Sequence, residues 1–298
     1  MLQVENLNKS FGSKQVLFDI NFKADNGKIL GLIGKNGSGK TTLFHSILKF
    51  VKYQGKITID GHSFSSRDYN SVGYLPEERS LMPKLTVLEQ VGFLASLKGM
   101  KKDKVKHDLQ DWMQKLEVKG QITDKIKSLS KGNQQKIQLI ATLIHQPNLI
   151  ILDEPFSGLD PVNVEIIKEV ILQEKKRGAT ILFSDHDMSN VEELCDDVVR
   201  INNGHIVLSG AVNDVRNNFG LTRLFIRTDL NLDNVKNLPG VEDAILQNNG
   251  IYKLWLTDAS YGEEIFDRLS HGKYLQTFDQ EPPTLDEIFK MKAGEENE

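Results

Sequence analysis

The order of hydrophobic and polar positions predicts strands over much of the first 210 residues. Residues 2–23 have strand character, and in 16–23 apolar side chains occupy every second position, the period of a half-buried strand. Continuously apolar runs, typical of strands covered on both faces of a parallel sheet, lie at 29–33, 149–152 and 179–183. Shorter strands are predicted at 56–61 and 72–76, and a hairpin at 198–209.

From residue 86 to about residue 145 the apolar spacing becomes helical. Two helices are predicted up to Gly99 and over 102–117, and a third over 134–145. Another helix is predicted over 162–177. The capping-box pattern Ser189-x-x-Glu192 predicts that a further helix begins there. Strands alternating with helices indicate an α/β fold in which the stretch at about 86–145 is helical.

The pattern changes after Gly210. Residues 213–221 are mostly polar and contain residues that favour turns, which predicts a linker. Short strands follow at 223–227, 244–247, 252–256 and near 274–278, with helices near 262–269 and 284–291. We therefore expect two domains: residues 1–215, and a small α+β domain at 216–298.

Composition narrows the class of protein. Of 298 residues, 39% are hydrophobic and 26% charged, as in a folded globular chain. The net charge of −4 argues against binding to nucleic acid through a strongly basic surface. The single cysteine, Cys195, excludes a disulfide framework. No apolar run approaches the roughly 18 residues that span a bilayer, and Met1–Glu5 does not resemble a cleaved leader, so we expect a cytoplasmic protein.

A glycine-rich loop follows the apolar run 29–33 and precedes an apolar helix. Its sequence is Gly34-Lys35-Asn36-Gly37-Ser38-Gly39-Lys40-Thr41-Thr42. A strand, such a loop and a helix form the context of a phosphate-binding P-loop, in which backbone N–H groups surround an anion. Lys40 is expected to reach the β- and γ-phosphates, and the Thr41 hydroxyl to bind Mg²⁺.

Two carboxylates end the buried run 149–152. Asp153 and Glu154 are placed at the carboxyl end of a strand, where open α/β sheets bind ligands. Asp153 suits the coordination shell of Mg²⁺, and Glu154 could polarise an attacking water. The alternative is an ordinary strand end at which Asp153 and Glu154 are exposed to solvent and have no function, and the P-loop upstream disfavours this alternative. His186 follows the strand 179–183 and could donate to the γ-phosphate.

Together these motifs resemble the nucleotide-binding domain of ATP-binding cassette (ABC) proteins, over about residues 1–215. The matching segments are the Walker A loop 34–42, the signature sequence 129–133, the Walker B strand 149–154 and the D-loop 157–160. His186 matches the switch histidine. The resemblance implies a P-loop ATPase that binds ATP and Mg²⁺. The implied nucleotide-binding residues are Phe11, stacked on adenine, with Asn36, Gly37, Ser38, Gly39, Lys40, Thr41, Thr42, Ser130 and Gly132.

Two motifs depart from the family pattern. In the signature sequence Lys131 and Asn133 replace Gly and Gln, but Ser130 and Gly132 remain. The Q-loop glutamine is replaced by Glu77. A carboxylate can still bind Mg²⁺, so Glu77 is a candidate metal ligand and catalytic residue beside Glu154 and His186, but it cannot donate a hydrogen bond as glutamine does.

The same resemblance implies partners. A cassette holds half a site, so a second ABC subunit, the same chain or a related one, should supply the signature sequence. The insert at 86–145 would contact an integral membrane permease, which would hold the protein at the inner face of the cell membrane. The variants Leu129–Asn133 and Pro76–Arg79, with the segment Glu281–Phe289, resemble a bacterial ABC exporter subgroup. An importer ATPase and an ABC ATPase acting on ribosomes or nucleic acid remain alternatives.

Overall fold

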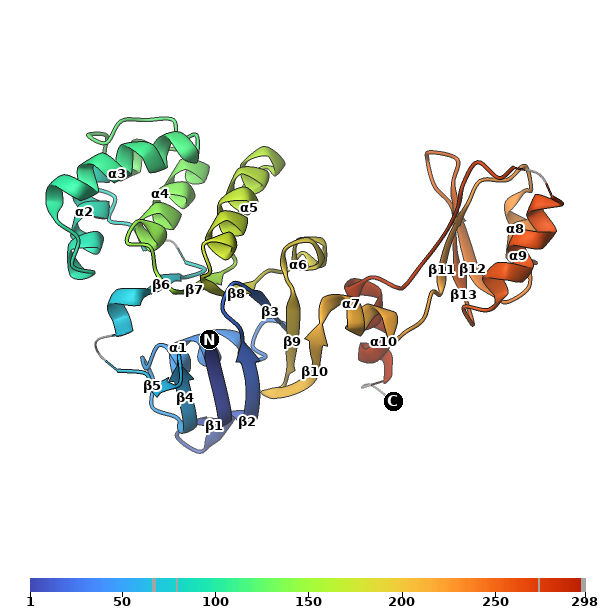
Figure 1. Ribbon diagram of the computed structural model, residues 1–298, viewed down its shortest axis with the longest axis horizontal. Coiled ribbons are helices and arrows are strands. Elements are labelled where there is room, and N and C mark those ends of the chain that lie inside the picture. Colours follow the sequence, from blue (N-terminus) through green and yellow to red (C-terminus); the bar gives the residue numbers. More distant parts are fainter. Residues whose placement is uncertain (66–67, 79, 273, 296–298) are drawn as a thin grey trace. The chain divides into compact units, whose positions relative to one another are not determined.

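The computed structural model describes residues 1–65, 68–78, 80–272 and 274–295. Arg79, the last residue of the Pro-Glu-Glu-Arg segment, lies outside the described residues. The chain divides into two compact units, Met1–Gly210 and Ala211–Glu298, called unit 1 and unit 2 below (Figure 1).

A six-stranded sheet forms the centre of unit 1. Its order is β10-β9-β3-β8-β7-β6. The strands are β3 (Ile29–Ile33), β6 (Val72–Leu75), β7 (Leu149–Asp153), β8 (Thr180–Ser184), β9 (Asp197–Asn202) and β10 (His205–Ala211). The pairs β9–β3, β3–β8, β8–β7 and β7–β6 are parallel. Every residue of β3, β7 and β8 is buried, which confirms the strands predicted from the three apolar runs.

A second, antiparallel sheet of order β2-β1-β4-β5 packs on the same core. Its strands are β1 (Leu2–Phe11), β2 (Lys14–Ala24), β4 (Gln54–Ile59) and β5 (His62–Ser63). On β2, Leu17 and Ile20 are fully buried whereas Val16 and Phe18 are partly buried, so the strict alternation of the sequence is not kept. Asp19 has a positive φ of 46° and the register shifts beside it, so a β-bulge reverses the alternation.

The helices of unit 1 pack on its sheets and on one another (Figure 1). They are α1 (Lys40–Ile47), α2 (Val87–Leu97), α3 (Lys102–Lys115), α4 (Lys131–Leu143), α5 (Pro161–Lys176) and α6 (Met188–Leu194), with short 3-10 helices at Asp68–Ser71 and Ile126–Ser128. The insert contains three helices as expected, but α4 begins before residue 134 because Ser130 is its N-cap. The capping-box prediction is wrong: Asp187 caps α6 by accepting from the Ser189 N–H, so the helix begins at Met188.

Unit 2 has a four-stranded sheet of order β12-β13-β11-β14, and its paired strands are all antiparallel. The elements are α7 (Val212–Asn217), β11 (Arg223–Ile226), α8 (Leu232–Lys236), β12 (Val241–Leu246), β13 (Tyr252–Leu256), α9 (Tyr261–Ser270), β14 (Phe278–Glu281) and α10 (Leu285–Glu295). Residues 223–281 thus follow the βαββαβ order of ferredoxin-like domains. The predicted linker is wrong in part, because Val212 and Val215 are buried on α7, and the last strand begins at Phe278.

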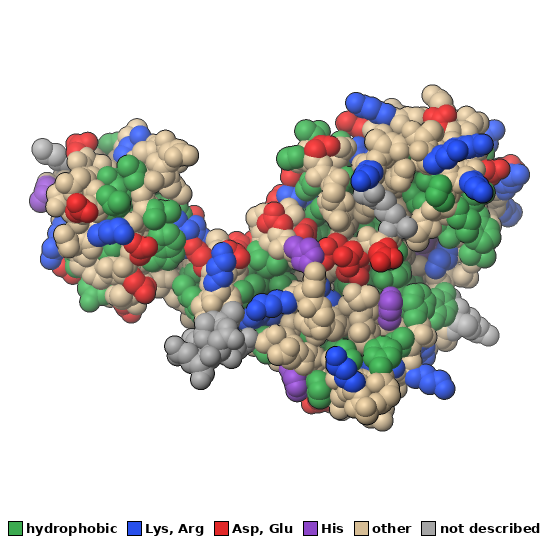
Figure 2. Space-filling model, turned by 180° about the vertical axis from the view of Figure 1, so that it is seen from behind, with side chains coloured by type: hydrophobic (Ala, Val, Ile, Leu, Met, Phe, Trp, Pro, Cys, Tyr) green, Lys and Arg blue, Asp and Glu red, His purple; other side chains and the backbone are tan. Residues whose placement is uncertain are grey.

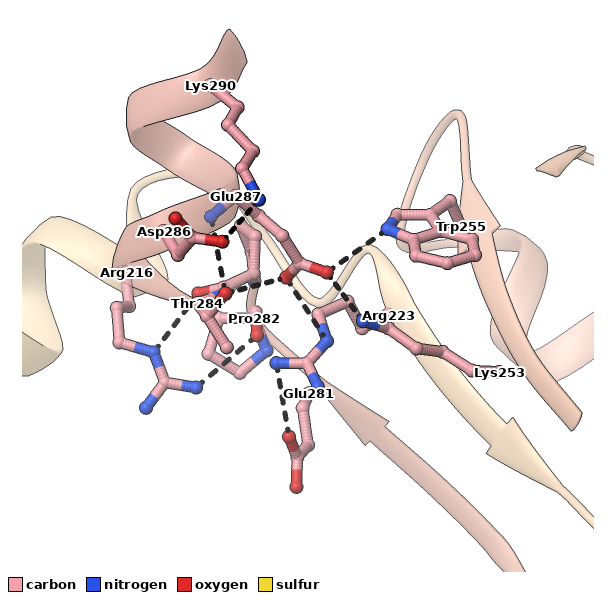
Figure 3. Close-up of polar contacts among 11 residues, drawn as sticks. Arg216, Arg223, Lys253, Trp255, Glu281, Pro282, Thr284, Asp286, Glu287 and Lys290 are labelled. Carbon is pink, nitrogen blue, oxygen red and sulfur yellow. Dashed lines mark hydrogen bonds and ion pairs between the residues drawn. The ribbon is translucent and has the colours of Figure 1, made fainter. Parts of the chain in front are cut away.

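One carboxylate in unit 2 anchors α10 to the sheet (Figure 3). Glu287 accepts a hydrogen bond from Lys253 Nζ at 2.6 Å and one from Trp255 Nε1 at 3.2 Å. Arg223 Nε lies 3.3 Å from the same carboxylate, which also accepts from the Thr284 N–H at 2.9 Å. Burial alone would raise the pKa of Glu287, but the hydrogen bond from Lys253 and the other donors outweigh it and lower the pKa to about 2.

Replacing Glu287 with glutamine should therefore loosen α10. We expect unit 2 to lose about 2 kcal/mol of stability, the cost of breaking a partly buried ion pair after solvent screening. Because the folded-state pKa is depressed, this stabilisation is present above the ordinary glutamate pKa of 4.5 and is lost as the pH falls towards 2. Hydrogen exchange of the amides in 285–292 in the full chain measures the effect.

The matched control is Asp286→Asn, which removes an exposed carboxylate whose ion-pair partner among the described residues is Lys290, one turn away. It should change exchange in α10 by less than about 0.5 kcal/mol. If Glu287→Gln exchanges no faster than Asp286→Asn at pH 7, Glu287 does not anchor the helix.

Candidate nucleotide-binding site

The glycine-rich loop joins β3 to α1 and closes tightly on itself. A side chain at Gly34 would place its Cβ 2.4 Å from Ile201 O and 2.4 Å from Ser38 Oγ, so only glycine fits there. Gly39, the N-cap of α1, has φ of 115°, a conformation that favours glycine. The loop therefore presents backbone N–H groups at the start of α1, as a phosphate-binding loop requires.

Lys40 lies inside this loop. Its side chain is buried, and Nζ donates to Gly34 O at 2.6 Å and to Lys35 O at 3.3 Å. Burial lowers the pKa of Lys40, whereas the negative charges of Glu154, Asp153 and Glu77 oppose that shift. The ammonium is thus held by two carbonyl oxygens, which an anionic ligand with stronger acceptors could replace.

A cavity of about 220 Å³ lies against the loop. Its lining joins segments more than 100 residues apart in the sequence: Val16, Asn36, Gly37, Gly39, Lys40, Thr41, Thr42, Glu77, Asp153 and Glu154. Ser38 is buried beside it, and its Oγ has no hydrogen-bond partner among the described residues. Figure 2 shows acidic side chains in a band across the middle of unit 1. The structure therefore brings the loop and all three predicted carboxylates together.

The two carboxylate oxygens of Asp153 differ in their hydrogen bonds. Oδ1 accepts a hydrogen bond from Ser184 Oγ at 2.6 Å, while Oδ2 is buried without a partner among the described residues. Burial raises the pKa of Asp153, and the Ser184 hydrogen bond opposes this. Asp153 lines the same cavity as Thr41 and Glu77, so the cavity offers two carboxylates and a hydroxyl, the oxygen donors that Mg²⁺ prefers. These residues fit the ion.

Glu154 lies next to Asp153 in an unusual backbone conformation. Its φ is 53°, which for a residue other than glycine costs about 1 kcal/mol. His186 Nε2 lies 2.6 Å from Glu154 Oε1. Burial raises the pKa of Glu154, and the nearby His186 opposes the shift. The turn after β7 thus aims a partly desolvated carboxylate into the cavity, with an imidazole beside it.

Five predicted site residues lie outside the lining of this cavity: Ser38 and His186, described above, and Phe11, Ser130 and Gly132. Phe11, at the end of β1, is 51% exposed, and Lys9 Nζ lies 4.2 Å from its ring centroid. Ser130 caps α4, where its Oγ accepts from the Asn133 N–H at 3.3 Å. Gly132 follows in the first turn of α4. The lining given above includes neither Ser130 nor Gly132, so within one chain the signature sequence and the P-loop do not share the cavity.

Sequence reasoning missed contacts that support the site. Ser184, the last residue of β8, bonds to Asp153, and a polar residue at the end of an apolar run was the available signal. Gln135 Nε2 donates to Pro155 O at 3.0 Å, and Gln138 Nε2 donates to Pro76 O at 3.4 Å. These two buried glutamines tie α4 to the turn after Glu154 and to the segment that carries Glu77.

Comparisons with known proteins agree with this geometry. The family described as ABC transporter matches residues 17–157, and the family described as ATP-binding protein DrrA1-3-like, C-terminal domain, matches residues 210–293. The chain is 38% identical over 295 residues to an uncharacterized ABC transporter ATP-binding protein, YhaQ, of Bacillus subtilis, covering 99% of each chain. It is 32% identical to the lipopolysaccharide export system ATP-binding protein LptB of Haemophilus influenzae, covering 76% of this chain and 97% of that one.

A solved structure titled as the ATP binding subunit of an ABC transporter is similar with a TM-score of 0.69 and 29% identity. The similarity covers 78% of this chain and 97% of that one, and confirms the predicted fold class. The chain therefore belongs to the ATP-binding subunits of ABC transporters, a family of ATPases, and carries a DrrA-like C-terminal domain.

Proposed function

We propose that this chain binds MgATP in the cavity at Lys40 and hydrolyses it to power a bacterial exporter through a separate membrane-spanning permease. The observation that carries the proposal is the convergence of Lys40, Thr41, Asp153 and Glu154 on one cavity. In this assignment the Lys40 ammonium leaves the loop carbonyls and binds the β- and γ-phosphates. Phe11, which is exposed at the end of β1, stacks on adenine.

Thr41, Asp153 and Glu77 would hold Mg²⁺, which when bound neutralises phosphate charge. Glu154 orients the attacking water and accepts its proton as the water oxygen bonds to the γ-phosphorus and the bond to the β-phosphate oxygen breaks. His186 is within hydrogen-bond distance of the Glu154 carboxylate and holds it in place. Glu77, an exposed carboxylate that lines the same cavity, belongs to the segment after β6, so a movement of that segment would move a proposed Mg²⁺ ligand.

Two chains would be needed for one complete site. Because Ser130 and Gly132 do not line the cavity of their own chain, we infer that each cassette presents them to the γ-phosphate of a second cassette. The Ser130 hydroxyl and the N-terminus of α4 suit an anion there. A homodimer is the simplest such assembly, and a heterodimer with a related ABC subunit would serve equally.

A groove in unit 1 suits the permease. A cavity of about 250 Å³ lies among β6, α2 and α4, and its lining includes Phe50, Leu94 and Leu97. Phe50 is 58% exposed and Leu97 is 62% exposed, an apolar pair that favours a protein partner. Pro76, the residue before Glu77, lines the same groove. A helix of the permease seated here would contact the segment that carries a proposed Mg²⁺ ligand.

No helix among the described residues is long and apolar enough to cross a membrane. We infer that the permease holds the chain at the inner face of the cell membrane. Export is the favoured direction because the similar LptB is named for an export system and the Glu281–Phe289 segment resembles that of exporter ATPases.

Introducing a charge into the groove should release the chain from its membrane partner. We expect Leu97→Asp to lower binding of the purified chain to native membranes at least about tenfold, because a carboxylate would be buried against apolar side chains. Affinity for ATP should stay unchanged. Sedimentation of the chain with washed membranes from its own cells measures the bound fraction.

The matched control is Val207→Asp, which places the same charge at an exposed apolar position on β10, outside the groove lining. It should bind membranes as the parent does. Equal binding by Leu97→Asp and the parent would show that the groove is not the permease site.

A further inference from the structure

Ser184 contacts the side chain of Asp153 and the backbone of Glu154. It is the last residue of β8, it pairs in register with Asp153 of β7, and it is fully buried. Its Oγ lies 2.6 Å from Asp153 Oδ1, and the backbone N–H of Glu154 donates to the same Oγ at 3.2 Å. One hydroxyl therefore contacts both consecutive acidic residues.

The direction of these two hydrogen bonds is fixed by chemistry. A backbone N–H can only donate, so the Ser184 oxygen accepts from Glu154. The one hydroxyl proton is then available for Asp153 Oδ1. A carboxylate oxygen occupied in this way is held in one orientation, and the other oxygen, Oδ2, remains buried without a partner among the described residues.

Glu154 is also held by the end of β8, but in a different way. Its N–H is 3.1 Å from the backbone oxygen of Ser184 as well as 3.2 Å from the hydroxyl. Loss of the hydroxyl alone would leave the backbone contact, so the turn with φ of 53° keeps a partner. Asp153 would lose the one donor described for its carboxylate. The hydroxyl therefore matters more for Asp153 than for Glu154.

We propose that Ser184 is a positioning residue for the divalent cation: its hydroxyl holds Asp153 so that Oδ2 faces the ion bound with ATP. This rests on the proposed function, in which Asp153 is a metal ligand. Groups that orient a metal ligand typically contribute 10- to 100-fold to metal affinity. Ser184 is not among the residues that line the cavity, so in this proposal it acts through Asp153.

The test compares ATP affinity with and without metal. The full chain and its Ser184→Ala variant are titrated with ATP in excess Mg²⁺ and again in a chelator, and the ratio of the two affinities gives the coupling between metal and nucleotide. We expect Ser184→Ala to reduce this ratio about tenfold and to leave affinity in the chelator unchanged. Ser184→Thr, which keeps a hydroxyl, should restore most of the ratio.

Ser46→Ala is the matched control. Ser46 is equally buried, and its Oγ donates to Thr42 O at 2.8 Å within α1, so the variant removes a buried hydroxyl without touching Asp153. Its metal coupling should equal that of the parent. Thermal unfolding of each variant verifies that the compared proteins are folded.

Two results would overturn the role of Ser184: a coupling ratio in Ser184→Ala equal to that of the parent, or an equal loss of affinity with and without metal, as a purely structural defect would give. Failure of the proposed function gives a different result. In that case the parent itself would bind no ATP, or would bind it without any dependence on Mg²⁺.

Discussion

Replacing Glu154 with glutamine should lower the rate of ATP hydrolysis about 1,000-fold, within the range by which general bases contribute to rate. Glutamine has nearly the same shape as glutamate but cannot accept a proton from water. The turn at residue 154 keeps its backbone partners, because the N–H bonds to Ser184 whatever the side chain. Binding of MgATP should therefore change by less than about threefold.

Phosphate release under single-turnover conditions measures the rate, and calorimetry measures the affinity. Glu169→Gln is the matched control, because it makes the same change at an exposed position of α5. It should hydrolyse ATP at the parental rate. A Glu154→Gln variant that retains more than a tenth of parental turnover would remove Glu154 from the role of base and direct attention to Glu77.

Replacing Lys40 with alanine should weaken binding of ATP by at least about 100-fold. The ammonium is buried in the loop, with two backbone carbonyls as its present partners. Two charge-assisted bonds to phosphate oxygens would contribute about 3 kcal/mol or more, and each 1.4 kcal/mol is a factor of ten. The variant also removes a cation that interacts with Glu154, Asp153 and Glu77, which further disfavours an anionic ligand.

Calorimetric titration with MgATP checks this expectation. The matched control is Lys56→Ala. It removes an equal charge from β4, where Lys56 forms an exposed ion pair with Glu5 of β1, and it should bind ATP as the parent does. Parental affinity in Lys40→Ala would contradict the assignment of the cavity to the phosphates.

Much of unit 1 follows from local pattern. The buried strands β3, β7 and β8 are evident because a continuous apolar run of this length is typical of a strand covered on both faces of a parallel sheet. The loop before α1 is evident because its glycines allow a close backbone approach at Gly34 and positive φ angles at Gly37 and Gly39. That Lys40, Asp153 and Glu154 meet follows from parallel topology, since the carboxyl ends of β3, β8 and β7, which pair in that order, share one edge of the sheet.

Other features depend on tertiary contacts that pattern does not show. A bulge at Asp19 exchanges which residues of β2 are buried, and one positive φ is enough to do so. The polar stretch after Gly210 becomes α7 because Val212 and Val215 are buried there. The link from Ser184 to Asp153 joins residues 31 apart and is visible only once the register of β7 and β8 is known.

The most direct test is the mass of the Glu154→Gln variant in solution with MgATP. If each chain holds half a site, the blocked variant should accumulate as an ATP-bound dimer, with twice the 33.7 kDa of one chain by light scattering. The same protein with ADP, or with Gly132→Asp added to disrupt the signature sequence, should stay at one chain. A single-chain mass in MgATP at every protein concentration would contradict the proposal that two copies of this chain complete one ATP site.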